Sequence, residues 1–155
     1  MKHARTVLRR RLRGFAAATD GAVTAWNLGW TIVFLLLGGL AVDVSNAWRM
    51  QTMLQSTADA AALAAVIDLP DESAATATAN QYATMNLDPE LHGDVLVDAD
   101  IVFGKLSAAY GTVNSGSTGR PNAVEVVLRR SADNGNSLPS TFLRLAGLDY
   151  WNIVA

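Results

Sequence analysis

The sequence contains no cysteine, and this absence excludes several kinds of site. Without thiols the chain has no thiolate metal ligand, no cysteine nucleophile and no disulfide. Other chemical signatures are missing as well: no serine lies in a Gly-x-Ser-x-Gly turn, and no glycine-rich loop is suited to hold a phosphate. The sequence therefore predicts a protein that is not an enzyme and that carries no cofactor.

Acidic residues are absent from the first nineteen positions. Six of the 12 basic residues lie within the first thirteen positions, and all but one of the 14 acids follow residue 42. This asymmetry indicates that the two ends of the chain occupy different environments. Because no aromatic residues interrupt Arg9–Arg11, we predict no nucleic-acid binding and interpret residues 1–20 as a cytoplasmic basic tail attracted to anionic lipid.

Charge is also absent from residues 21–42. As a helix this run measures roughly 33 Å, enough to cross a hydrocarbon core of about 30 Å. The basic residues precede it and Asp43 follows it, so the positive-inside rule predicts a single transmembrane helix over 21–43 with its N-terminus inside. A secretory signal peptide has the same order of features, although its apolar run is usually only ~7–15 residues. The alternative is a secreted or periplasmic binding domain released by cleavage after Ala47.

Small and polar residues follow one stripe of this apolar run. An asparagine in hydrocarbon needs a hydrogen-bond partner, and small residues let two helices approach closely. The stripe therefore predicts packing against another membrane helix, unless the asparagine lies close enough to the interface to meet water. The residues of this membrane-helix packing stripe are Thr24, Asn27, Thr31 and Gly38.

Proline and glycine are both absent from residues 48–68. Residues at helical spacing form an expected inner face, namely Met50, Leu54, Thr57 or Ala58, Ala61, Ala64 and Ile67. Gln51, Gln55 and Asp59 form a polar line on another side. The membrane helix is thus predicted to continue outward over 44–70 until Leu69-Pro70 ends it. The small residues of LQSTADAAALAA, positions 54–65, predict a partner-contact helix composed of Leu54, Gln55, Ala58, Asp59, Ala61 and Ala62.

The remaining residues, 71–155, predict a small α+β domain. A helix capped by Asp71 or Ser73 is expected to run to about Met85. Its inner residues are expected to be Ala75, Ala79 and Tyr82. After a loop over 86–94, alternation predicts a strand over 95–103 with Val95, Val97, Ala99, Ile101 and Phe103 on one face. A loop is expected over 111–122, followed by a strand over 123–130 with Val124, Val126 and Leu128 inward. A turn over 133–136 and a short helix over 137–146 follow. The strand expected from Tyr150 reaches the last residue, which indicates a chain cut short or a short member of a longer family.

Acidic side chains concentrate between residues 88 and 100. Oxygen ligands of this kind suit a hard cation, but their spacing fits no familiar calcium loop. We therefore interpret them as solvated loop carboxylates and predict no metal. The group comprises Asp88, Glu90, Asp94, Asp98 and Asp100, with His92 among them.

Three motifs occur in order along the first part of the chain: Asp20-Gly21 before the apolar run, GLAVDV at 39–44 and LQSTADAAALAA at 54–65. Together they resemble the TadE/TadG-like family of tight-adherence (Flp) pilus assembly proteins, specifically the N-terminal region of a TadG-like protein. Further matches follow in order at 82–83, 103–104, 122–126, 136–139 and 142–143. The resemblance implies a pilin-like helix and antiparallel-sheet domain in the periplasm, anchored by one pass through a bacterial inner membrane. It also implies contacts with pilin subunits or other pilus-assembly proteins, in a homo- or hetero-oligomer.

Two departures from that family refine the expectation. Prepilin-like relatives have a glutamate at the fifth position after the cleavage glycine, whereas here Thr19 follows Gly14 and Trp26 follows Gly21 at that distance. Longer relatives also carry a von Willebrand A-type domain, which this sequence lacks. We therefore expect an uncleaved, TadG-like membrane anchor that acts through protein–protein contacts.

Overall fold

The computed structural model describes residues 21–107, 111–115 and 119–155. The basic tail, residues 1–20, lies outside the described residues. The chain divides into two compact units, Met1–Leu40 and Ala41–Ala155. The fold class is α+β, as predicted: a long apolar N-terminal helix is followed by a small helix and antiparallel sheets.

The long helix, α2, extends over Ala22–Ala65, and the 3-10 turn η1, Val66–Asp68, follows it directly. Leu69 then adopts an extended conformation before Pro70, which lacks the N–H needed to continue a helix. The predicted continuation of the apolar helix and its end at Leu69-Pro70 are both confirmed.

A second helix, α3, covers Glu72–Asn86, and the single turn α4 covers Pro89–His92. Asp71 is the N-cap of α3: its carboxylate accepts hydrogen bonds from the backbone N–H groups of Ser73 and Ala74, both at 3.1 Å. Asp88 caps α4 in the same way through Glu90 N–H at 2.9 Å. The segment 86–94, predicted to be only a loop, thus contains one helical turn.

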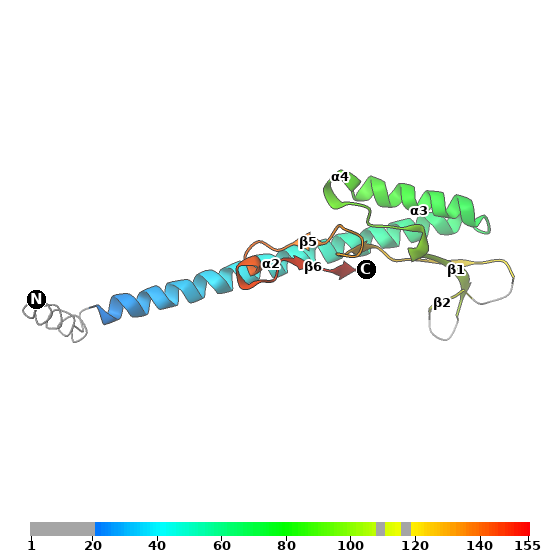
Figure 1. Ribbon diagram of the computed structural model, residues 1–155. Helices are drawn as coiled ribbons and strands as arrows, with labels where there is room; N and C mark the ends of the chain where they lie inside the picture. Colours follow the sequence, from blue (N-terminus) through cyan, green and yellow to red (C-terminus); the bar gives the residue numbers. More distant parts are fainter. Residues whose placement is uncertain (1–20, 108–110, 116–118) are drawn as a thin grey trace, which may run out of the picture. The chain divides into compact units, whose positions relative to one another are not determined.

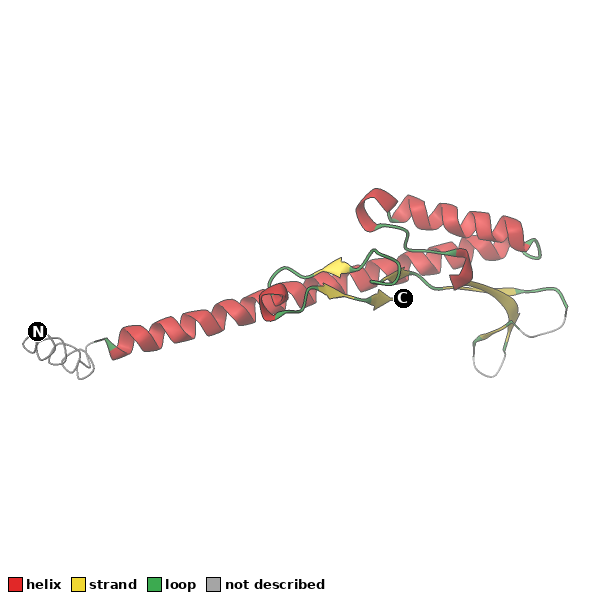
Figure 2. Ribbon diagram, viewed as in Figure 1, coloured by secondary structure: helices red, strands yellow, loops and turns green. Residues whose placement is uncertain are grey.

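The strands are short and form three separate sheets. In the three-stranded sheet, β1 (Ile101–Leu106) lies between β2 (Val113–Asn114) and β3 (Ala123–Val126). Two further antiparallel pairs join β4 (Arg129–Arg130) with β7 (Ile153–Val154) and β5 (Leu138–Pro139) with β6 (Tyr150–Trp151). Figure 2 shows the β5–β6 pair and the three-stranded sheet at different places in the unit 41–155.

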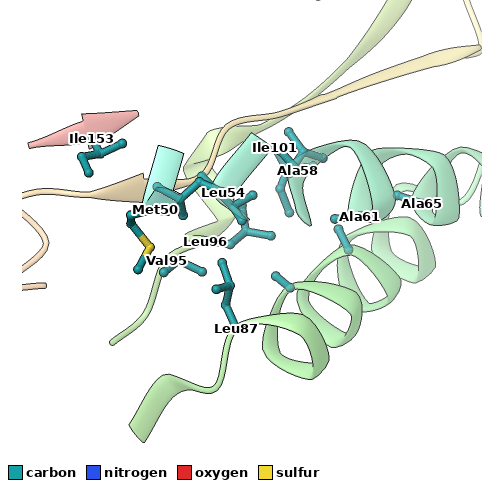
Figure 3. Close-up of a cluster of buried hydrophobic side chains, with 14 of the residues drawn as sticks. Met50, Leu54, Ala58, Ala61, Ala65, Leu87, Val95, Leu96, Ile101 and Ile153 are labelled. Atoms are coloured by element: carbon teal, nitrogen blue, oxygen red, sulfur yellow. The ribbon is translucent and has the colours of Figure 1, made fainter. Parts of the chain in front are cut away.

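The core of this unit is built around the outer half of α2. Leu54, Leu87 and Leu96 point toward one another, as Figure 3 shows, and Leu54 is fully buried. Alanines from α2 (Ala58, Ala61 and Ala65) and α3 (Ala75, Ala79 and Ala83) belong to the same cluster. Small side chains suit this arrangement because they allow helices to pack closely. The predicted inner face of α2 is buried from Met50 to Ala64.

Four of the predicted core positions are wrong. Ile67 is 80% exposed because the chain changes there from α-helix to a 3-10 turn, which breaks the helical spacing. On α3, Tyr82 is exposed and Ala83 is buried instead, one residue further along the helix. Val97 and Ala99 are also exposed, because residues 98–100 form the 3-10 turn η2 and the strand begins only at Ile101.

The segment 137–146 is not the predicted helix. Its first part forms β5, in which Leu138 and Pro139 pair with Trp151 and Tyr150. Only Leu143–Ala146 is helical, as the 3-10 turn η3, and Gly147 ends it in the left-handed conformation at φ 83°. Sheet pairing with a segment that lies later in the chain therefore overrides the local helix signal.

Candidate membrane anchor and contact surfaces

The first half of α2 is long and apolar enough to span a membrane. The most apolar 18-residue window of the helix has a mean hydropathy of 1.9, and only 11% of that window is buried. It is the only such helix among residues 21–107, 111–115 and 119–155. Its aromatic residues contact one another: the Trp26 and Trp30 rings meet edge to face at 5.9 Å, and Trp30 and Phe34 lie 5.7 Å apart. A helix with this hydropathy and so little burial fits a membrane protein.

The predicted membrane-helix packing stripe is exposed along its length. Thr24, Asn27, Thr31 and Gly38 are all exposed. The hydroxyl of Thr31 donates to the backbone carbonyl of Asn27 at 2.8 Å, one turn earlier in the same helix. Nothing lies within 4 Å of the place where a Cβ would be at Gly38. The stripe is open to a second helix, and its packing stays a prediction.

The predicted partner-contact helix divides between the core and the surface. Leu54, Ala58 and Ala61 are buried within the chain's own core, so they are unavailable to a partner as the main contact. Gln55 and Asp59 are exposed on the neighbouring face, where the Gln55 amide donates to the Asp59 carboxylate at 3.3 Å. Of the six residues, Gln55, Asp59 and the half-buried Ala62 remain candidates for contact.

An open groove of about 490 Å³ lies beside these candidates. Gln55, Asp59 and Leu63 contribute to it from α2, and Val113 and Glu125 contribute from strands β2 and β3. Leu63 is 70% exposed, so the groove combines an apolar side chain with a carboxylate from each side. A groove of mixed character at the surface of a helix is suited to contact another protein chain rather than to hold a small molecule.

Asp43 connects α2 to a segment about a hundred residues later. Its carboxylate accepts hydrogen bonds from three successive backbone N–H groups: Thr141 at 2.9 Å, Phe142 at 2.8 Å and Leu143 at 2.7 Å. The residue is only 3% exposed. A carboxylate satisfied by several backbone N–H groups is a strong, charge-assisted contact. The sequence gives no signal for it beyond a lone acid directly after the apolar run.

The comparisons with known proteins cover the apolar helix, its continuation and Asp43, but not the strands or the segment 141–143. Residues 21–79 match the family model described as "Putative Flp pilus-assembly TadE/G-like". Over this segment, which is less than half of the chain, the protein is similar to the TadE/G-like family. No curated protein and no solved structure matches the chain. The resemblance stated from the sequence is therefore confirmed for the apolar helix, its continuation and the first part of α3, while the matches proposed after residue 79 stay predictions.

Arg130 is buried beside a histidine, a methionine and a backbone carbonyl. Its Nε donates to the backbone carbonyl of Asn136 at 2.8 Å, and its Nη1 lies 3.5 Å from His92 Nδ1 and 4.0 Å from Met50 Sδ. Among the described residues it forms no ion pair, and burial lowers the pKa of Arg130. Burial first and then the positive charge of Arg130 hold the pKa of His92 below its ordinary value of 6.5.

Asn136 organises the backbone around this cluster. Its amide donates to the carbonyls of Asp94 at 2.8 Å and Arg129 at 3.1 Å, and its side-chain oxygen accepts from Ser131 N–H at 2.8 Å. Gly93 has φ 71°, and a Cβ there would lie 2.6 Å from the Asn136 Cβ. Glycine at 93 is therefore required both by the backbone conformation and by this close approach.

Three of the five acidic residues between 88 and 100, namely Asp88, Asp98 and Asp100, form contacts within the fold. Asp100 pairs with Arg129, its Oδ1 lying 2.9 Å from Nη2, and Asp98 accepts from the Asn80 amide at 2.9 Å. In the described part of the chain, no three potential ligands among histidine, aspartate and glutamate come together. The carboxylates of Asp88, Asp98 and Asp100 therefore serve as local structural acceptors.

Proposed function

We propose that this protein is a membrane-anchored structural component of an Flp-type pilus or a related secretion system, and that it acts through protein–protein contacts. The observation that carries the proposal is the TadE/G-like match over residues 21–79, because it includes both the apolar helix and its outward continuation. In this proposal the N-terminus is cytoplasmic and the unit 41–155 is periplasmic, beyond a bacterial inner membrane. The orientation follows from the basic residues at 2–13.

The partner surface in this proposal is the groove beside Gln55 and Asp59. It combines an exposed leucine with charged and amide groups, which is the composition of a protein contact that forms and dissolves during assembly. The occupant is a pilin subunit or another assembly protein, and the exposed stripe in the apolar helix would hold a membrane helix of the same complex.

The contact surface is tested by reversing the charge of Asp59. We expect Asp59→Lys to reduce co-purification of pilus components from native membranes at least several-fold, since the carboxylate lies in the groove and has no role in the core. Gln81→Lys is the matched control, because Gln81 is an exposed helical residue that does not line this groove. Unchanged co-purification with Asp59→Lys would remove the groove from the proposal.

A secreted binding domain released after Ala47 is the competing function. Two observations favour the anchored form: Ala47 lies inside the helix Ala22–Ala65, and cleavage there would separate Asp43 from the three N–H groups that it accepts. Loss of that carboxylate would leave three donors without their acceptor.

A further inference from the structure

The segment 141–150 exposes a concentration of large apolar side chains. Leu145 is 80% exposed, Leu148 59%, Tyr150 54% and Phe142 43%. They lie within ten residues around the 3-10 turn η3, and they are separate from the core cluster of the unit 41–155. Four large apolar residues exposed this close together mark a surface that binds either another protein or a membrane.

This segment is folded back on itself. Ser140 N–H donates to Asp149 O at 3.0 Å, Leu148 N–H donates to Leu143 O at 3.1 Å, and the Ser140 hydroxyl also donates to Leu148 O. With β5 and β6 paired at its base, the segment forms a closed loop. The loop therefore presents its apolar side chains from a fixed backbone.

The position of the loop is set by Asp43. Three successive N–H groups at its start, those of residues 141–143, donate to the Asp43 carboxylate at 2.7–2.9 Å. In Figure 1 the orange-red segment lies beside the part of α2 with which the unit 41–155 begins, and β5 and β6 follow further along the helix. The loop thus belongs to the end of the unit that is nearest to residue 41.

That end of the unit is adjacent to lipid if the apolar helix spans a membrane. The charge-free run ends at Val42, and Asp43 is the next residue. A run of this length leaves a following charge at the boundary between hydrocarbon and headgroups. A loop attached to that carboxylate lies at the same depth.

We propose that the loop 141–150 is a second membrane contact, whose apolar side chains enter the headgroup and upper acyl region of the outer leaflet. This inference rests on the proposed transmembrane anchor. The partner is a lipid surface, because the loop is attached at the membrane boundary and combines aliphatic and aromatic side chains with one cation. The cation is Arg144, whose side chain is 76% exposed and whose Nε lies 3.7 Å from Asp149 Oδ1. Its guanidinium can reach a lipid phosphate while its aliphatic stem stays among acyl chains.

The absence of cysteine permits a direct test in the full chain. Leu145→Cys is labelled with a nitrobenzoxadiazole dye and reconstituted into phosphatidylcholine–phosphatidylglycerol vesicles that contain lipids with nitroxide on the acyl chain. We expect the nitroxide lipids to quench the dye at position 145 several-fold more strongly than the same dye at Ile67→Cys. Ile67 is a matched control because it is also apolar and 80% exposed, but it lies about 35 Å along the helix from Asp43.

A third label distinguishes the two ways in which the inference can fail. Leu35→Cys places the dye inside the apolar run, so it reports the span itself. Strong quenching at 35 with equal, weak quenching at 145 and 67 would overturn the membrane contact alone, and would assign the exposed loop to a protein partner. Absence of quenching at 35 would overturn the transmembrane anchor and the loop contact together.

The role of Asp43 is tested in the same vesicles. Asp43→Asn weakens the acceptor that holds residues 141–143, so we expect quenching at position 145 to fall toward the value at position 67, while quenching at position 35 is unchanged. Quenching at 145 that is unaltered in this variant would overturn the claim that Asp43 positions the loop at the membrane.

Discussion

Asp43 is the residue on which the contact between α2 and the late segment of the chain depends. Its carboxylate accepts hydrogen bonds from three successive backbone N–H groups, and the Thr141 side chain also hydrogen-bonds to it. If the carboxylate were removed, these partly buried N–H groups would lose their acceptor, which lowers stability. The contact therefore stabilises the segment 141–143 specifically.

We expect Asp43→Ala to increase amide hydrogen exchange at residues 141–143 by about tenfold or more, because losing charge-assisted hydrogen bonds favours local opening. Exchange followed by mass spectrometry in detergent micelles measures this effect. Asp59→Ala is the control, since Asp59 is an exposed aspartate on the same helix that accepts a hydrogen bond from its helical neighbour Gln55. Unaltered protection at 141–143 would show that other contacts hold the segment.

His92 makes the stability of the unit 41–155 sensitive to acid. Its pKa is lowered by burial and by Arg130, while Asp88 acts in the opposite direction and Arg49 reinforces the lowering. The folded state thus binds its proton less readily than the unfolded state. The contribution of neutral His92 to the free energy of unfolding is fully present above pH 6.5, the ordinary pKa of histidine. It is lost as the pH falls through the lowered pKa of His92 in the folded state.

For this reason we expect His92→Gln to reduce the fall in thermal stability between pH 7.5 and pH 5. Thermal unfolding of both proteins across this range gives the comparison. The reading would be wrong if the two proteins lost the same amount of stability on acidification.

Among the elements, α3 packs in the core through alanines, so its fit depends on side-chain size. Ala79 is fully buried and belongs to the core cluster with Ala58 and Ala61 of α2. Ala79→Leu inserts three more carbon atoms at a site without room for them. We expect the free energy of unfolding to fall by about 1–3 kcal/mol, measured by denaturant titration in mild detergent. Ala77→Leu, at an exposed position of the same helix, should change it little.

Helical periodicity predicted the elements that depend on local sequence. It identified α2, its end at Leu69-Pro70 and the buried positions from Met50 to Ala64, because an apolar stripe at helical spacing has to face the core. It was wrong at Ile67 and Tyr82, where a change of helix type or a shift of one residue moved the side chain to the surface. The helix expected over 137–146 became β5 and η3, since pairing with residues 150–151 is a long-range contact that no local pattern contains.

The candidate site was predictable only in part for the same reason. The polar line of Gln51, Gln55 and Asp59 was expected on the surface, and all three are exposed. The contact of Asp43 with residues 141–143 joins positions 98 to 100 residues apart, so spacing alone does not reveal it. The loop that this contact positions was likewise hidden from the sequence.

For the whole molecule, the proposed anchor predicts that the apolar helix and the unit 41–155 stay in one polypeptide. Intact mass and N-terminal sequencing of the protein from native membranes are expected to show a chain that retains Asp43. A mature start at Trp48 would contradict the anchor, and a start at Phe15 or Ala22 would instead indicate prepilin-like processing. Both measurements use the native protein and need no variant.

The hydrogen bonds of Asp43 also impose an order in time on biogenesis. The carboxylate is synthesised first, and residues 141–143 follow about a hundred positions later. At translation rates of about 5–20 residues per second, the delay is roughly 5–20 s. During that interval α3 and the three-stranded sheet emerge while Asp43 has no contact with residues 141–143, so closure of this contact is a late event in the assembly of the unit.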